Sequence, residues 1–146
     1  MASTVEDFLT AAEEKAVIDA IRVAEAQTSG EIRVHLERHT DLPPIKRAQQ
    51  LFHLLKMDNT KAENGVLIYV AVDDHQLAIL GDKGINNKVP DDFWESTKDA
   101  MILAFKKGHF KQGLLDGIAS VGEKLQHYFP WDHQDTNELP DEISTS

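Results

Sequence analysis

The side chains with the clearest chemical potential are aspartates that stand after apolar runs or at the start of a helical pattern. They are Asp73, Asp74, Asp82, Asp91 and Asp92. Carboxylate and carbonyl oxygens are the ligands that hard cations such as Ca²⁺ and Mg²⁺ prefer. A divalent-cation site is therefore one interpretation of these residues. Turn formation and helix capping are the other.

Other catalytic patterns are absent from the sequence. It contains no GxSxG elbow, Walker loop or GxGxxG segment, and Gly-Asp-Lys-Gly at 81–84 is too short for a phosphate loop. Cysteine is absent, which excludes disulfides and thiolate metal sites. The 7 histidines show no HExxH spacing. We expect them to be ordinary surface side chains.

Length and charge place this chain among single-domain proteins. Its 146 residues suit one domain. The formal net charge of −10 argues against non-specific nucleic-acid binding, which needs a basic face. Half of that charge lies after position 130, where acidic residues occur without Lys or Arg. We expect one domain over 1–130 and an acidic, disordered tail over 131–146.

The sequence shows no targeting or membrane segment. The N-terminal stretch lacks a basic region followed by a long apolar one. The longest apolar run, 66–72, is far shorter than the ~20 residues of a membrane helix. We therefore expect a soluble, cytoplasmic protein that acts as a monomer, with no nucleic-acid partner.

The first half of the chain predicts a helix, a strand and a second helix. Thr10 and Glu13 fit a capping box, and Gly30 is placed to end the first helix. The strict alternation in 31–37 predicts a strand near the sheet edge with one apolar and one solvent-exposed face. Pro44 suits the first turn of the next helix.

The second half predicts a buried hairpin and two further helices. The run 66–72 has no alternation, which is typical of a strand buried on both faces. Strand, helix and strand in that order imply a right-handed parallel crossover. The short gap 73–75 then returns the chain as a hairpin strand, 76–80. With helices opening at Asp91 and ending before Pro130, we predict a mixed sheet of at least three strands covered on both faces.

The geometry of such a sheet decides which aspartates can meet. Asp74 follows a strand at its carboxyl end, where open α/β sheets bind ligands. Asp82 ends the returning antiparallel strand and so belongs to the opposite edge. We therefore favour a cluster in which Asp82 faces Asp91 or Asp92 across the intervening loop. In the alternative interpretation, Asp74 and its neighbour form a turn while Asp91 and Asp92 cap a helix.

Several segments, taken in order, resemble the TPM domain family. They are Leu-Thr-x-x-Glu-Glu at 9–14, Ser-Gly-Glu-Ile-Arg-Val at 29–34, Asn-Gly-Val-Leu-Ile-Tyr-Val-Ala at 64–71, Ala-Ile-Leu-Gly-Asp-Lys-Gly-Ile at 78–85 and Ala-Phe-Lys-Lys-Gly-His-Phe-Lys-Gln-Gly-Leu at 104–114. The resemblance covers about residues 7–129 and rests on the order and spacing of these segments. It implies a three-layer α/β/α sandwich around a mixed central β-sheet.

The resemblance also implies a kind of site. Divalent-cation binding, of calcium especially, is associated with acidic loops at the end of the family's sheet. Carried over by position, this implicates four metal ligands here. They are Asp74, Asp82, Asp91 and Asp92. Where the family often has Gly-Tyr-Gly or Gly-Arg-Gly, this sequence has Gly-Asp-Lys-Gly at 81–84.

Two functions are consistent with these residues. The first is a binding module whose acidic loops take up a divalent cation. The second is a metal-assisted acid phosphatase acting on phosphomonoesters, an activity proposed for thylakoid-lumen members of the family. In that case Asp82 and Asp91 would hold the ion, and Asp92 or Asp74 would act as base or nucleophile. Phosphatases also recruit Arg or Lys to the phosphoryl oxygens. Only two lysines lie in these loops, which favours the binding module.

Overall fold

The computed structural model describes residues 8–59, 63–130 and 143–145. Its centre is a four-stranded sheet with the strand order β3-β2-β1-β4. The strands are β1 (Glu31–Glu37), β2 (Gly65–Ala71), β3 (Gln76–Gly81) and β4 (Ser144–Thr145). β1 runs parallel to β2 and to β4, whereas β3 runs antiparallel to β2. The predicted mixed sheet is confirmed.

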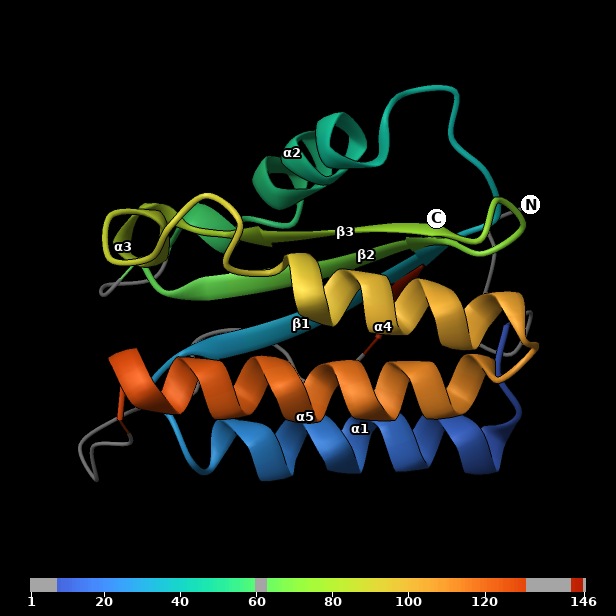
Figure 1. Ribbon diagram of the computed structural model, residues 1–146, viewed down its shortest axis with the longest axis horizontal. Helices are drawn as coiled ribbons and strands as arrows, with labels where there is room; N and C mark the ends of the chain where they lie inside the picture. Colours follow the sequence, from blue (N-terminus) through green and yellow to red (C-terminus); the bar gives the residue numbers. More distant parts are fainter. Residues whose placement is uncertain (1–7, 60–62, 131–142, 146) are drawn as a thin grey trace.

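Helices cover both faces of this sheet. The helical segments are α1 (Ala11–Glu25), α2 (Pro44–Leu54), the 3₁₀ turn η2 (Met57–Asn59), α3 (Lys83–Asn86), α4 (Glu95–Lys106) and α5 (Phe110–Tyr128), of which α3 lies at one end of the sheet (Figure 1). Figure 1 shows α1, α5 and α4 side by side along one face, with α2 on the other. This arrangement is the three-layer α/β/α sandwich. Within the described ranges, no helix has both the length and the apolar character needed to cross a bilayer.

The capping box predicted for the first helix is present. The Thr10 hydroxyl accepts a hydrogen bond from the Glu13 amide at 3.1 Å, and the Glu13 carboxylate accepts one from the Thr10 amide at 2.9 Å. Two of the free amides at the helix start are thereby satisfied. The helix ends at Glu25, earlier than Gly30. Gly30 instead lies where an added Cβ would be 2.9 Å from the Leu125 side chain of α5.

The central strands separate two hydrophobic cores. All of β2 is buried, as its unbroken apolar run predicts. Its even-numbered side chains pack with β1 and with helices α1, α4 and α5. Its odd-numbered side chains Leu67, Tyr69 and Ala71 pack beneath Ala48 and Leu51 of α2. β2 therefore anchors the whole sandwich and fixes the loops at its two ends.

The polar face of β1 is not solvent-exposed, so that part of the prediction is wrong. Glu31 and His35 have only 5% and 2% of their surface exposed. The His35 ring stacks on Tyr69 of β2 with 6.2 Å between centroids, and its Nδ1 lies 2.9 Å from the Ser144 hydroxyl of β4. Alternation reports the polarity of side chains, whereas neighbouring strands decide what covers them.

The disorder expected after position 130 is contradicted at residues 143–145. Ile143 is 6% exposed and belongs to the main core. Ser144 and Thr145 pair in parallel with His35 and Leu36 of β1. A two-residue strand leaves no periodic signal in an acidic segment, so composition alone could not reveal it. The remaining residues of that expectation, 131–142 and 146, lie outside the described ranges.

Candidate functional site

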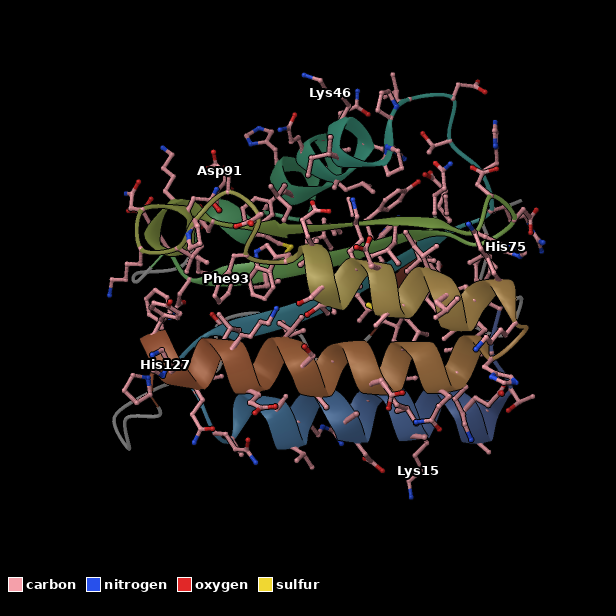
Figure 2. All side chains as sticks on the ribbon, viewed as in Figure 1. Lys15, Lys46, His75, Asp91, Phe93 and His127 are labelled. Atoms are coloured by element: carbon pink, nitrogen blue, oxygen red, sulfur yellow. The ribbon has the colours of Figure 1, made fainter. Side chains whose placement is uncertain are left out.

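The four predicted metal ligands lie at two opposite ends of the sheet. Asp74 belongs to the turn after β2, and Asp82 directly follows β3. Because β2 and β3 are antiparallel and β2 has 7 residues, roughly 20 Å of strand separates the two aspartates. Figure 2 shows Asp91 beside α3, far from His75 in the β2–β3 turn. Asp74 therefore cannot share an ion with Asp82.

At the carboxyl ends of β1 and β2, Asp74 is paired with a histidine. His39 Nδ1 lies 2.8 Å from Asp74 Oδ1, and His39 Nε2 lies 2.8 Å from Asp41 Oδ1. The hydrogen bond with Asp74, and then that with Asp41, raises the pKa of His39 to about 9. The same bond with His39 lowers the pKa of Asp74. At neutral pH a protonated imidazole thus lies between these two carboxylates and offsets one of their two negative charges.

At the other end, Asp82 holds a carboxylate that is only partly satisfied. It is the N-cap of α3, and its Oδ1 accepts a hydrogen bond from the Lys83 amide at 2.7 Å. The residue is only 5% exposed. Its Oδ2 is buried and has no hydrogen-bond partner in the part of the chain that the structure describes. A buried anionic oxygen without a donor is costly, so the charged form of this carboxyl is disfavoured unless a donor or a cation reaches it.

Two further acids reinforce the negative charge around Asp82. Burial raises the pKa of Asp82, and the charges of Glu63 and Asp58 raise it further, against an opposing hydrogen bond from Lys83. The Gly84 amide donates to the Glu63 carbonyl at 2.8 Å, which holds the loop before β2 against α3. Neither Glu63 nor Asp58 stands out in the sequence. Glu63 comes to this end of the sheet because it precedes β2, whose pairing with β3 places Gly65 opposite Asp82.

Asp91 and Asp92 lie on an exposed turn, and the predicted helix does not open at them. α4 begins at Glu95, its N-cap is Trp94, and no side chain caps it. The interpretation of these aspartates as helix caps is therefore wrong, and Asp92 contributes its carbonyl to the turn by accepting the Glu95 amide at 3.1 Å. The acids that shift the pKa of Asp82 are Glu63 and Asp58, not this pair.

No complete metal centre is assembled in the described residues. Among them, no three His, Cys, Asp or Glu side chains are grouped so that they could hold a metal ion. A cation at Asp82 would therefore need backbone carbonyls and water for most of its coordination, as calcium sites commonly use.

The fold is that of a three-layer α/β/α protein, with α2 on one face of the mixed sheet and α1, α4 and α5 on the other (Figure 1). The sequence profile of the TPM domain matches residues 3–124, and the chain belongs to the TPM domain family. The NMR structure of the BA42 protein from the psychrophilic bacterium Bizionia argentinensis is similar over the whole chain. It is 59% identical, covers 98% of this chain and 99% of that chain, and has a TM-score of 0.89.

Two other solved structures are similar in fold. The N-terminal domain of a P. gingivalis protein is 23% identical with a TM-score of 0.70, and covers 86% of this chain and 83% of that chain. The N-terminal domain of the cg2496 protein from Corynebacterium glutamicum is 16% identical with a TM-score of 0.64, and covers 96% of this chain and 81% of that chain. No curated protein sequence matches this chain.

Proposed function

We propose that this TPM-type protein is a binding module for a divalent cation, calcium by preference, with Asp82 as the anchoring ligand. One observation carries the proposal. The Asp82 carboxylate is buried, and its Oδ2 has no donor among the described residues. Leaving a buried charge unpaired costs several kcal/mol as an order of magnitude. A bound cation removes that cost.

The surroundings of Asp82 suit calcium better than magnesium. Glu63 and Asp58 add negative charge, and the Glu63 carbonyl, which accepts the Gly84 amide, lies at the start of α3. Ca²⁺ accepts about six to eight oxygen ligands in a flexible arrangement, whereas Mg²⁺ demands a near-octahedral one. In this proposal Asp91 and Asp92 add negative potential from the turn at the same end. Asp74, paired with His39 at the far end, takes no part in the same ion.

A proton and the cation compete for the same oxygen of Asp82. Because burial raises the pKa of this carboxyl, protonation begins at a higher pH than for an ordinary aspartate. Cation affinity should therefore fall as the pH is lowered through that pKa.

The phosphatase alternative has less support. Among the residues that shift the pKa of Asp82, Lys83 is the one cation, whereas phosphoryl transfer needs several positive donors. Asp74 lies too far away to serve as base or nucleophile for an ion at Asp82, which leaves Asp92 for that role. Aryl phosphate turnover that survives repurification and disappears in Asp82→Asn would favour the enzyme. A cytoplasmic location and a monomeric state also stay predictions.

Isothermal titration calorimetry with CaCl₂ and with MgCl₂ tests the binding module. Wild-type protein should bind Ca²⁺ saturably at one site and Mg²⁺ more weakly. Asp82→Asn should weaken Ca²⁺ binding by about tenfold or more, which corresponds to about 1.4 kcal/mol. Asp74→Asn is the matched control, because it removes the same charge at the opposite end. Equal affinities in wild type and Asp82→Asn would contradict the proposal.

A further inference from the structure

The two edges of the sheet are completed in different ways. The chain covers the β1 edge itself by adding β4. At the opposite edge, β3 has no neighbouring strand among the residues described. β3 reads Gln-Leu-Ala-Ile-Leu-Gly, without the charges or prolines that usually protect an edge strand from pairing. The β3 edge is therefore able to accept another strand.

The register with β2 identifies the backbone groups that face this edge. The Asp82 amide donates to the Gly65 carbonyl at 2.9 Å, and Ala78 lies opposite Tyr69 in the same register. Bonded and non-bonded positions alternate along an antiparallel pair. Ala78 therefore bonds to β2, whereas Leu77 and Ile79 direct their N–H and C=O groups away from it. These N–H and C=O groups recur at every second residue, which is the spacing at which an added strand forms hydrogen bonds.

A groove with a volume of about 390 Å³ lies along this edge. Its floor includes Leu77 and Ile79, and its walls include Ile45 at the start of α2 and Trp94 before α4. In Figure 1, β3 passes between α2 and α4. Leu77 and Ile79 are buried at the floor. Because α2 and α4 flank this recess, a single extended segment suits it better than the helix-covered edge of a second copy.

Carboxylates give the groove its electrostatic character. Asp91 and Glu95 lie along it, and Asp92 is next to Asp91 on the same exposed turn. Lys98, the cation in the groove, lies with its Nζ 3.5 Å from Glu95 Oε2. Charge complementarity therefore favours a basic partner, and a second copy would bring a matching acidic rim.

We infer that this groove docks an extended, basic segment of a partner protein, which adds a strand to β3. Its backbone would pair with Leu77 and Ile79, and a Lys or Arg side chain would reach Asp91. An apolar side chain beside it would lie against Ile45 and Trp94. Main-chain hydrogen bonds would provide affinity, and the acidic rim and apolar walls would provide specificity. This docking does not depend on the proposed cation site.

The test uses the blocked peptide Lys-Val-Thr-Val-Lys-Val-Thr as probe, with EDTA present throughout. Amide NMR should show saturable shifts at Leu77 and Ile79. Affinity should fall by about tenfold when Glu replaces Lys in the peptide, and by a similar factor in Asp91→Lys. Asp19→Lys, the same charge change on exposed α1, should leave the affinity unchanged.

A second pair of probes tests the backbone pairing itself. N-methylation of alternate peptide amides removes donors on one edge of the peptide, so the variant methylated on the edge facing β3 should lose binding. Affinity that is the same in both N-methyl variants, or the same for the Glu and Lys peptides, would overturn the inference. Concentration-dependent shifts at Leu77 without peptide would overturn it in favour of self-association.

Discussion

The amide of Lys83 donates to one oxygen of the Asp82 carboxylate at 2.7 Å, and this is the single hydrogen bond to that carboxylate among the described residues. The bond caps α3, as an aspartate at a helix start commonly does. The second, buried oxygen has no donor among the described residues, and the negative charges of Glu63 and Asp58 help to raise the pKa of the carboxyl. The Asp82 side chain thus caps α3, and the charged form of its carboxyl has one oxygen without a hydrogen-bond donor among the described residues.

Asp82→Asn should stabilise the cation-free protein at neutral pH. Asparagine keeps the cap and removes the buried charge, so the free energy of unfolding should rise by about 1 kcal/mol in EDTA. A raised pKa contributes stability that is present below the ordinary value and lost as the pH rises through the folded-state pKa. The gain should therefore grow between pH 4 and pH 7. Urea denaturation at both pH values checks this, with Asp19→Asn as an exposed control.

His35 should govern the loss of stability in mild acid. Burial lowers its pKa to about 4 from an ordinary 6.5. Between these pH values His35 is protonated in the unfolded chain but neutral in the folded protein. The free energy of unfolding therefore decreases as the pH falls. The loss should reach up to about 3 kcal/mol by pH 4. Urea denaturation should show a weaker pH dependence in His35→Gln, and an unchanged slope would contradict this role.

His39 should titrate on the alkaline side of neutrality. Its pKa of about 9 arises first from Asp74 and then from Asp41. The stability it contributes should be complete below pH 6.5 and lost as the pH rises through 9. Histidine ring NMR should show its pKa falling toward 6.5 in Asp74→Asn, and by less in Asp41→Asn. A wild-type value near 6.5 would exclude the ion pair.

Gly122 sets the distance between α1 and α5. A Cβ added there would lie 2.6 Å from the Ala24 Cβ and 3.2 Å from its backbone Cα. Gly122→Ala should therefore lower the free energy of unfolding by about 1–3 kcal/mol, despite alanine's better helix propensity. Adding Ala24→Gly should recover part of this loss in urea denaturation. A more stable Gly122→Ala protein would show that the helices separate freely.

Much of the fold follows from local patterns in the sequence. Thr10 and Glu13 predict the start of the first helix, and the unbroken apolar run 66–72 predicts the central strand. The hairpin at 73–75 fixes the antiparallel return, and with it the separation of Asp74 from Asp82. These features are predictable because each depends on neighbouring residues and on sheet periodicity.

The candidate site is harder to predict from the sequence, because it depends on contacts between segments that are distant along the chain. Asp82 could be singled out from its place after a strand, but its burial could not. Asp58, in η2, and Glu63, just before β2, belong to a polar stretch without a motif, and their effect on the pKa of Asp82 arises from tertiary structure. Ser144 follows an acidic segment and shows no pattern typical of a strand. Its hydroxyl nevertheless lies next to the His35 ring of β1. Tertiary contacts thus decided which polar residues became buried.

Amide NMR titration with Ca²⁺, followed by EDTA reversal, tests the central claim most directly. Localised, saturable shifts should appear around Glu63, Lys83 and Gly84, be lost in Asp82→Asn, and persist in Asp74→Asn. Shifts that are weak and scattered over exposed acids, or that are the same in Asp82→Asn as in the wild type, would contradict a cation site at Asp82.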